Sequence, residues 1–243
     1  MEWFESWFDS PYYKILYQHR NDNEAQFFIQ NLLNKIPLKP YDNILDLACG
    51  RGRHAKWINH FGFNVYGIDL SENSIAEAKP LENTRLHFFV QDMRYFSLPV
   101  SFALILSLFT SFGYFENPED NFKVLKRIYQ HLKPQGYFVL DFLNAHWVVQ
   151  NLVEKETKVI QDVQFEITKF IENKKIIKQI DVKDGNLNYT FYEKVNLFTL
   201  DDLSTMLEKE NYHILAQWGN YDLSDYEQNS PRVILWAEKK EVI

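Results

Sequence analysis

The sequence is short of the features that mark secreted and membrane-spanning proteins. It has a single cysteine, Cys49, among 243 residues, so an internal disulfide is excluded and a reducing compartment is expected. No apolar run reaches the ~18 residues that a membrane-spanning helix needs. The first residues include Glu2, Glu5 and Asp9 but no basic segment before an apolar core, so no signal peptide is expected. We therefore expect a cytoplasmic protein.

Basic residues are fewer than acidic ones. Lys and Arg total 26 against 33 Asp and Glu, which gives a formal net charge of −7, and no block of five or more consecutive basic residues occurs. This balance argues against nucleic acids and anionic membranes as partners. Apolar residues make up 46% and aromatic residues 16%. That is enough to build the core of one large domain, or of one domain with an elaboration.

The most informative stretch spans residues 43–54. An apolar run carries Asp46 near its end, Gly50 and Gly52 follow, and then a helical pattern begins. Two glycines at this spacing let the backbone turn sharply and approach a ligand closely. The helix that follows offers unpaired N–H groups at its start. This strand–turn–helix arrangement predicts a binding site for a nucleotide-type cofactor.

Two classes of cofactor suit this turn. Residues 50–55 fit the dinucleotide fingerprint, and Asp69 ends the next strand near the distance of ~20 residues expected for a ribose-binding acid. An NAD(P)-dependent oxidoreductase is therefore one hypothesis. Asp46 argues for another cofactor, because dinucleotide enzymes usually have an apolar residue there. Asp92 and Met93, after the third strand, suit the amino group and the ring face of an adenine.

Five motifs together resemble those of the class I S-adenosylmethionine (SAM)-dependent methyltransferases, over nearly the whole chain. They are the first glycine motif at 46–52, the second acidic motif at 69–71, the third at 91–93, the fourth strand at 104–108, and the turn into strand five at 132–138. There are two departures from the pattern. Arg51 stands where the family often has Thr or Ser, and Gln135 replaces a glycine.

The resemblance implies a doubly wound α/β fold with a mostly parallel, seven-stranded, Rossmann-like sheet. The chain pattern agrees, because apolar strands alternate with helical periodicity. Strands are expected at 43–47, 64–68, 85–90, 102–106 and 137–142, helices at 22–36, 52–61, 71–80, 118–131 and 200–211, and a final β-hairpin at 212–218 and 231–238. The ligand is expected at the carboxyl ends of the parallel strands.

Three parts are expected within the chain. Residues 1–40 form an N-terminal lid, 41–152 and 199–243 form the SAM-binding core, and 153–198 form an inserted antiparallel β cover. Segments 159–170, 175–182 and 186–198 alternate apolar and polar residues, and 183–186 is a hairpin signal. The insert is expected to cover the substrate pocket or to form a dimer interface, so both a monomer and a homodimer remain open.

The resemblance implies SAM as cofactor and assigns most of its contacts. Asp46 is expected near the amino group and Asp69 at the ribose hydroxyls. In the lid, tyrosine faces suit a sulfonium cation, and Arg20 suits the methionine carboxylate. A packing role for His54 fits equally well. The expected cofactor-binding residues are Tyr13, Tyr17, Arg20, Asp46, Ala48, Gly50, Gly52, His54, Asp69, Leu70, Asp92, Met93 and Ser107.

The motifs say less about which residues bind the methyl acceptor on the other side of the site. Phe112, Tyr114, Asn144 and Arg232 are candidates for substrate binding, and either Asp141 or His146 is a candidate base.

Metal is not expected, since strand four lacks the terminal acid of metal-dependent catechol methyltransferases. That strand also lacks the Asp/Asn-Pro-Pro-Tyr motif of enzymes that methylate DNA bases or protein glutamine. The predicted function is methyl transfer from SAM to an N or O atom of a small molecule. The alternatives are an NAD(P)-dependent oxidoreductase and a non-catalytic SAM-binding protein.

Overall fold

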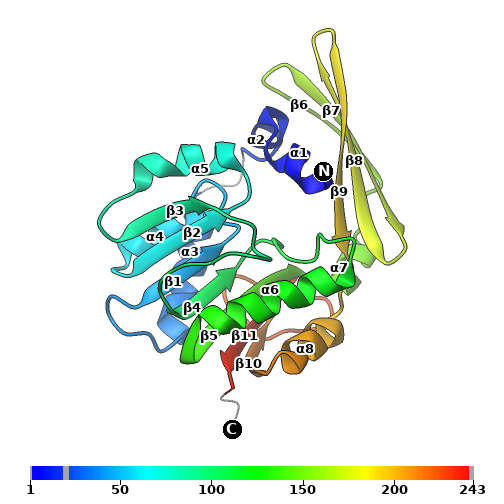
Figure 1. Ribbon diagram of the computed structural model, residues 1–243. Helices are drawn as coiled ribbons and strands as arrows, with labels where there is room; N and C mark the ends of the chain where they lie inside the picture. The colour runs from blue at the N-terminus through cyan, green and yellow to red at the C-terminus, as the bar shows by residue number, and fades with distance from the viewer. Residues whose placement is uncertain (1, 19–21, 241–243) are drawn as a thin grey trace.

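The main sheet has the predicted doubly wound topology. The computed structural model describes residues 2–18 and 22–240. Seven strands lie in the order β10-β11-β5-β4-β1-β2-β3 (Figure 1). Strands β1 to β5 run parallel, and β11 pairs antiparallel with both β5 and β10. The strands are β1 (Asn43–Leu47), β2 (Asn64–Asp69), β3 (Leu86–Val90), β4 (Phe102–Ser107), β5 (Leu132–Leu143), β10 (Tyr212–Trp218) and β11 (Arg232–Lys239).

Helices cover both faces of this sheet. Phe28 of α3, Ile58 of α4 and Ile75 of α5 share one buried cluster, whereas Val124 of α6 and Leu203 of α8 belong to another. The predicted helix starts at 71 and 199 are confirmed, because both residues cap their helices with side-chain oxygens. The helices are α3 (Asp22–Lys35), α4 (Arg53–His60), α5 (Glu72–Ala78), the 3₁₀ turn η1 (Lys79–Leu81), α6 (Pro118–His131), α7 (Ala145–Gln150) and α8 (Leu200–Lys209).

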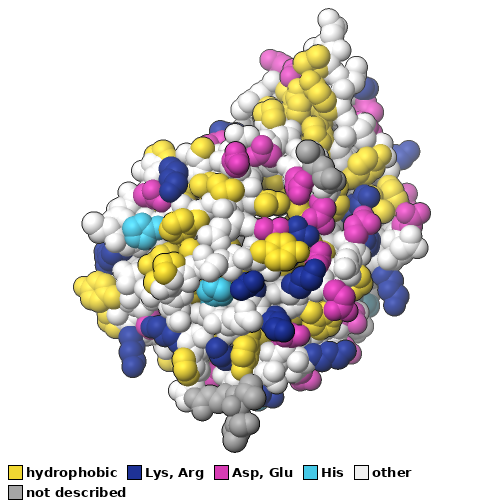
Figure 2. Space-filling model, in the orientation of Figure 1, with side chains coloured by type: hydrophobic (Ala, Val, Ile, Leu, Met, Phe, Trp, Pro, Cys, Tyr) yellow, Lys and Arg dark blue, Asp and Glu magenta, His cyan; other side chains and the backbone are white. Residues whose placement is uncertain are grey.

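A second sheet projects from the first as an antiparallel meander. Its strands are β6 (Lys155–Ile160), β7 (Val163–Glu172), β8 (Lys175–Asp184) and β9 (Leu187–Asn196). The predicted hairpin at Gly185 is confirmed, and this glycine has a φ of 57°. On the face seen in Figure 2, acidic and basic side chains are interspersed, as expected for a mixed surface of modest net charge.

Three details refine or correct the sequence prediction. The alternating segment 159–170, part of an insert predicted to have three or four strands, contains the β6–β7 turn, where Gln161 and Asp162 both have positive φ. No glycine marks this turn, so its signal in the sequence is weak. Strand β5 begins at Leu132 rather than at 137, with an irregular register against β4. The short helix α7 was not predicted.

The first two helices, α1 (Trp3–Phe8) and α2 (Pro11–Leu16), pack on the second sheet, and α1 also joins the core of the main sheet through Phe4. Figure 1 shows them between α5 and β9. The Trp7 indole and the Leu16 side chain join Phe165 and Ile180 of the second sheet in a buried cluster. The N-terminal segment therefore spans the gap between the two sheets, above the carboxyl ends of β1 and β2.

Candidate active site

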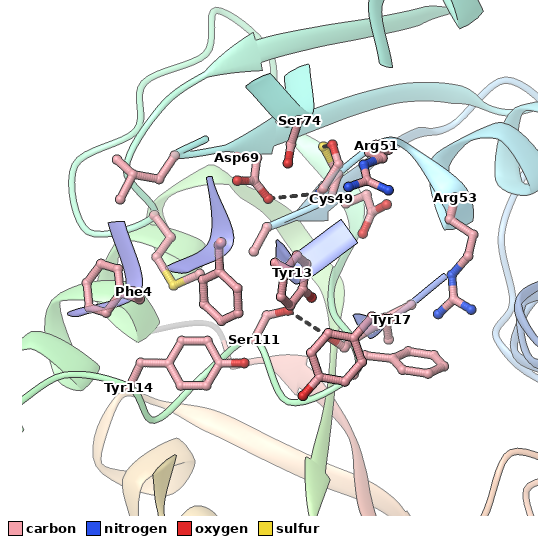
Figure 3. A pocket seen from close by; sticks show the side chains of 18 of the residues that line it. Phe4, Tyr13, Tyr17, Cys49, Arg51, Arg53, Asp69, Ser74, Ser111 and Tyr114 are labelled. Atoms are coloured by element: carbon pink, nitrogen blue, oxygen red, sulfur yellow. Dashed lines mark hydrogen bonds between the residues drawn. The ribbon is translucent and has the colours of Figure 1, made fainter. Parts of the chain in front are cut away.

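A cavity of about 290 Å³ lies at the carboxyl ends of β1, β2 and β4, under α1 and α2. Figure 3 shows Asp69 and Cys49 on one side of it, and Ser111, Tyr17 and Tyr114 on the other. Its lining comes from the glycine turn, the loops after β2, β3 and β4, the first two helices, and Glu193 and Val195 of β9. Both sheets thus contribute to a single cavity.

The glycine turn holds Asp69 in place. Gly50 and Gly52 both have positive φ, of 54° and 76°. A Cβ atom on Gly52 would lie 2.5 Å from Cζ of Phe88, so this position requires glycine for space as well as for conformation. The Gly50 N–H donates to Asp69 Oδ2 at 2.8 Å, and the Ser71 N–H donates to Oδ1 at 2.9 Å. These bonds fix a carboxylate whose pKa burial raises.

Asp46 is a buried acid at the end of β1 that also lines the cavity. Burial raises its pKa to about 7, and the charge of Asp69 acts in the same direction. A hydrogen bond from the Ala55 N–H and the charge of Arg53 oppose this shift. Within residues 2–18 and 22–240, no group hydrogen bonds to Asp46 Oδ2. A buried oxygen without a partner fits a cationic ligand group such as the amino group of SAM.

Asp92 is held by an arginine. Arg94 contacts the Asp92 carboxylate through Nε at 3.0 Å and Nη2 at 2.6 Å. The same guanidinium reaches Asp120 of α6 at 3.1 Å and Glu2 at 2.8 Å. Met93 lies beside Asp92 in the cavity lining. This network orients the loop after β3 and ties it to the N-terminal segment.

Aromatic rings form the wall opposite the glycine turn. The ring centroids of Tyr13 and Tyr17 in the α2 segment lie 4.9 Å apart. Phe8 lies 5.0 Å from Tyr13 and 5.5 Å from Tyr114, which follows β4. Aromatic faces attract cations through their ring quadrupoles. The wall therefore suits a ligand that carries positive charge, as a sulfonium does.

Most of the predicted cofactor residues meet at this cavity. Gly52 and Ser107 are not among its lining residues; Gly52 packs on Phe88, and Ser107 is fully buried at the end of β4. Arg20 lies outside the described residues. His54 is buried in the lining, with its ring 5.0 Å from that of Phe109. The predicted residues that do line the cavity are Tyr13, Tyr17, Asp46, Ala48, Gly50, His54, Asp69, Leu70, Asp92 and Met93.

Two of the predicted acceptor-side residues pair with each other. Arg232 Nε donates to Asp141 Oδ1 at 2.7 Å, and Asp141 Oδ2 accepts from the Phe109 N–H at 2.7 Å. Burial raises the pKa of Asp141, although the charge of Arg232 opposes this. Arg232 also donates to the Thr110 hydroxyl at 2.9 Å. The pair thus supports the loop after β4, and neither residue is among those that line the cavity.

The other acceptor-side candidates lie in different places. Tyr114 lines the cavity, whereas Phe112 is buried in the core. Asn144 is also buried; its Oδ1 accepts from the His146 N–H and so caps α7. Its amide also donates to two backbone carbonyls before β11. Neither Asn144 nor His146 is among the lining residues, and the catalytic roles suggested for Asp141 and His146 stay predictions.

Sequence reasoning missed several polar residues of the cavity, which include Glu193 of β9, Lys14, Arg53 and Ser74. Along β9, positions 187, 189, 191 and 195 are apolar and share one face, so an acid at 193 interrupts an apolar series. That interruption was the available signal. The aromatic residues Trp3, Phe4 and Phe8 of α1, which lie within the predicted lid, also line the cavity.

No group of three or more His, Cys, Asp or Glu side chains in residues 2–18 and 22–240 is placed to hold a metal ion. No helix within these ranges is long and apolar enough to cross a membrane.

Comparison with known proteins places these features in context. Residues 17–217 match a family model described as a methyltransferase domain. The chain is 28% identical over 167 residues to dTDP-3-amino-3,4,6-trideoxy-alpha-D-glucopyranose N,N-dimethyltransferase of Streptomyces venezuelae. The matched region covers 65% of this chain and 68% of that protein. It is 30% identical over 142 residues to glycine/sarcosine N-methyltransferase of Halorhodospira halochloris, which covers 56% of this chain and 52% of the relative.

The fold also matches that of a solved structure. A S-adenosylmethionine-dependent methyltransferase from Clostridium acetobutylicum superimposes with a TM-score of 0.79 at 21% identity. The superposition covers 95% of this chain and 96% of that chain, so the shared architecture extends over nearly the whole length of both.

Proposed function

This chain belongs to the methyltransferase domain family, as a SAM-dependent enzyme, and from that premise we propose that it methylates a nitrogen or oxygen atom of a small molecule. The observation that carries the proposal is the cavity itself. An unpartnered buried oxygen of Asp46 and the fixed carboxylate of Asp69 lie on one side, and aromatic rings lie on the other. SAM supplies an activated methyl group as a sulfonium.

We assign the cofactor half of the cavity as follows. Asp69, held by two backbone N–H groups, keeps lone pairs with which to accept the ribose hydroxyls. Asp46 accepts the amino group through Oδ2. Leu70 and Met93 pack on the adenine, and Asp92 accepts from its amino group. The chain itself then contributes orientation of the reactants and exclusion of water.

Residues 1–40 act as a lid and residues 153–198 as a cover in this proposal. Ser71 and Asn73 of the core donate to the Asp9 carboxylate of the lid, at 2.7 and 2.8 Å. Trp7 of the lid donates to Glu193 of the cover at 2.7 Å. The lid is thus attached to both sheets, which supports an enclosed site for a small acceptor. Both relatives named above act, by name, on small amines.

A transfer assay tests this function. The protein is incubated with SAM and a panel of acceptors that contains glycine, sarcosine, amino sugars and small hydroxyl compounds, and S-adenosylhomocysteine (SAH) is measured by chromatography. We expect SAH to form only with particular acceptors. A non-catalytic SAM-binding protein would bind SAM yet form no SAH with any of them. An NAD(P)-dependent oxidoreductase would bind nicotinamide nucleotides instead.

We further propose that the protein is a cytoplasmic monomer or homodimer. The single, buried cysteine supports the cytoplasmic location, because a free thiol suits a reducing compartment. Sedimentation velocity distinguishes the two oligomeric states.

A further inference from the structure

The inward face of the second sheet carries an ion pair of β8 and β9 that lies between apolar pairs along the two strands. On β8 and β9, residues of this face alternate with outward residues. Lys178 and Glu193 are direct cross-strand partners on it. The pairs that flank them along the face are apolar, namely Ile176 with Val195 and Ile180 with Phe191. Across the sheet, Lys169 of β7 is the other cross-strand partner of Lys178, and it lies 2.8 Å from Glu156 of β6. Glu193 is therefore the end of a row of charged residues, at the point where the sheet reaches the cavity.

Burying such a pair does not by itself favour folding. The side chains of Lys178 and Glu193 are only 14% and 18% exposed, and desolvation of buried charges offsets most of their attraction. An apolar pair at the same two positions would be as stable, or more stable. Of the two residues, Glu193 lines the cavity, where a charged side chain is within reach of a bound ligand.

The contacts of Glu193 leave one oxygen available. Oε1 accepts from the Trp7 indole N–H at 2.7 Å and from the Tyr17 hydroxyl at 2.6 Å. Oε2 lies 3.5 Å from Lys178 Nζ, beyond the usual length of a charge-assisted hydrogen bond. Lys178 donates instead to the Tyr17 hydroxyl. Oε2 therefore keeps lone pairs for a further donor, and Glu193 lines the cavity.

The position of Glu193 separates it from the other acids of the site. Among the described lining residues, three acids lie at or just after the carboxyl ends of main-sheet strands, whereas Glu193 comes from the second sheet; these three are Asp46, Asp69 and Asp92. It stands on the side of the aromatic wall, next to Tyr17. A carboxylate flanked by aromatic faces is a suitable receptor for an organic ammonium group.

We propose that Glu193 binds the methyl acceptor and that this acceptor is an amine, an inference that rests on the function proposed above. The bound ammonium gives one proton to the Glu193 carboxylate. An O–H bond forms as the N–H bond breaks, and the electron pair stays on the nitrogen. The resulting neutral amine has the lone pair that methyl transfer requires. A hydroxyl acceptor would not supply this cationic partner.

Sinefungin tests the assignment without knowledge of the natural acceptor. In this SAM analogue, a carbon that bears an amino group replaces the methylated sulfonium, so its ammonium occupies the position of the transferred methyl group. Calorimetry compares sinefungin with SAH, which lacks that group. For Glu193→Gln we expect sinefungin binding to weaken by about tenfold to a hundredfold, the effect of one charge-assisted hydrogen bond. SAH binding should change less than about threefold.

Two control variants separate binding from support of the lid. Trp7→Phe removes a hydrogen bond to Glu193 but keeps the carboxylate, so the ratio of sinefungin to SAH affinity should be unchanged. Asp181→Asn removes a carboxylate from the outward face of the same sheet, where it accepts from Thr190, and should leave both affinities unchanged. If Glu193→Gln folds poorly, the double variant Lys178→Met/Glu193→Gln avoids a buried lone ammonium and is expected to give the same ratio.

An equal loss of sinefungin and SAH affinity in Glu193→Gln would overturn the proposal, because it would show that Glu193 only supports the lid. No change for either ligand would overturn it as well. Failure of the unaltered protein to bind SAH at all would instead contradict the proposed methyltransferase function, so the two failures are distinguishable.

Discussion

Replacing Asp46 with asparagine is expected to stabilise the ligand-free protein. Burial raises the pKa of this carboxyl from 3.8 to about 7. In the unfolded chain, the group ionises near its ordinary value. Between about pH 4 and pH 7, the folded state therefore holds a proton that the unfolded state has lost. Stability falls as pH rises wherever the folded state binds more protons, so this acid destabilises the fold at neutral pH.

The expected size follows from the shift. About 3 pKa units at 1.36 kcal/mol each amount to about 4 kcal/mol. The destabilisation is absent below about pH 4, grows by about 1.4 kcal/mol per pH unit, and is complete above about pH 7. Asparagine has a similar shape and does not titrate. The unfolding free energy of Asp46→Asn should therefore exceed that of the unaltered protein by an amount that grows from pH 4 to pH 7 and then stays constant.

Urea unfolding at pH 5, 6, 7 and 8 measures this difference. Asp69 and Asp141, whose pKa values are also raised by burial, are present in both proteins, so their contributions largely cancel. A difference that stays constant across these pH values would refute the reasoning, because it would mean that Asp46 has the same pKa in the folded and unfolded states.

The same substitution is expected to weaken SAM binding by about tenfold to a hundredfold, since a charge-assisted hydrogen bond to the amino group is lost. Methylthioadenosine lacks the amino-acid portion and is the matched control ligand. Its affinity should be the same for both proteins. An equal loss of affinity for SAM and methylthioadenosine would show that Asp46 acts on the whole site rather than on the amino group.

Three further substitutions test other parts of the account. Asp69→Ala should weaken SAH binding about a hundredfold by calorimetry, whereas the exposed neighbour Glu72→Ala should not; equal effects would contradict the ribose assignment. Gly52→Ala should lower the unfolding free energy in urea by about 2 kcal/mol, because the added Cβ meets Phe88 and φ is positive; unchanged stability would argue against that contact. Gln135→Gly should raise the unfolding free energy by about 1 kcal/mol, because Gln135 has a φ of 58°, which strains a residue with a side chain. A loss of stability would show that the Gln135 side chain contributes more than this strain costs.

The sequence was sufficient to predict the main sheet and the gathering of the strand-end acids at one cavity. Buried parallel strands are continuous apolar runs, and β1 coincides with the predicted residues 43–47. Asp46, Asp69 and Asp92 were predicted to converge because each lies at or just after the carboxyl end of a strand in one sheet. Topology brings such ends together, whatever the distance along the chain.

The contacts of Glu193 and the pairing of Asp141 with Arg232 join segments that are far apart in the sequence, and no local pattern encodes them. Trp7 and Glu193 are 186 residues apart in sequence and meet only because α1 packs on the second sheet. Asp141 and Arg232 were proposed separately, one as a base and one as a substrate ligand. Their pairing arises from the antiparallel register of β5 and β11, which the sequence does not specify.

Calorimetric titration of the unaltered protein with SAH, NAD and NADP tests the central claim most directly. The account predicts micromolar binding of SAH, one ligand per chain, and no binding of either nicotinamide nucleotide. Binding of NAD or NADP without binding of SAH would contradict it and would assign the glycine turn to a dinucleotide.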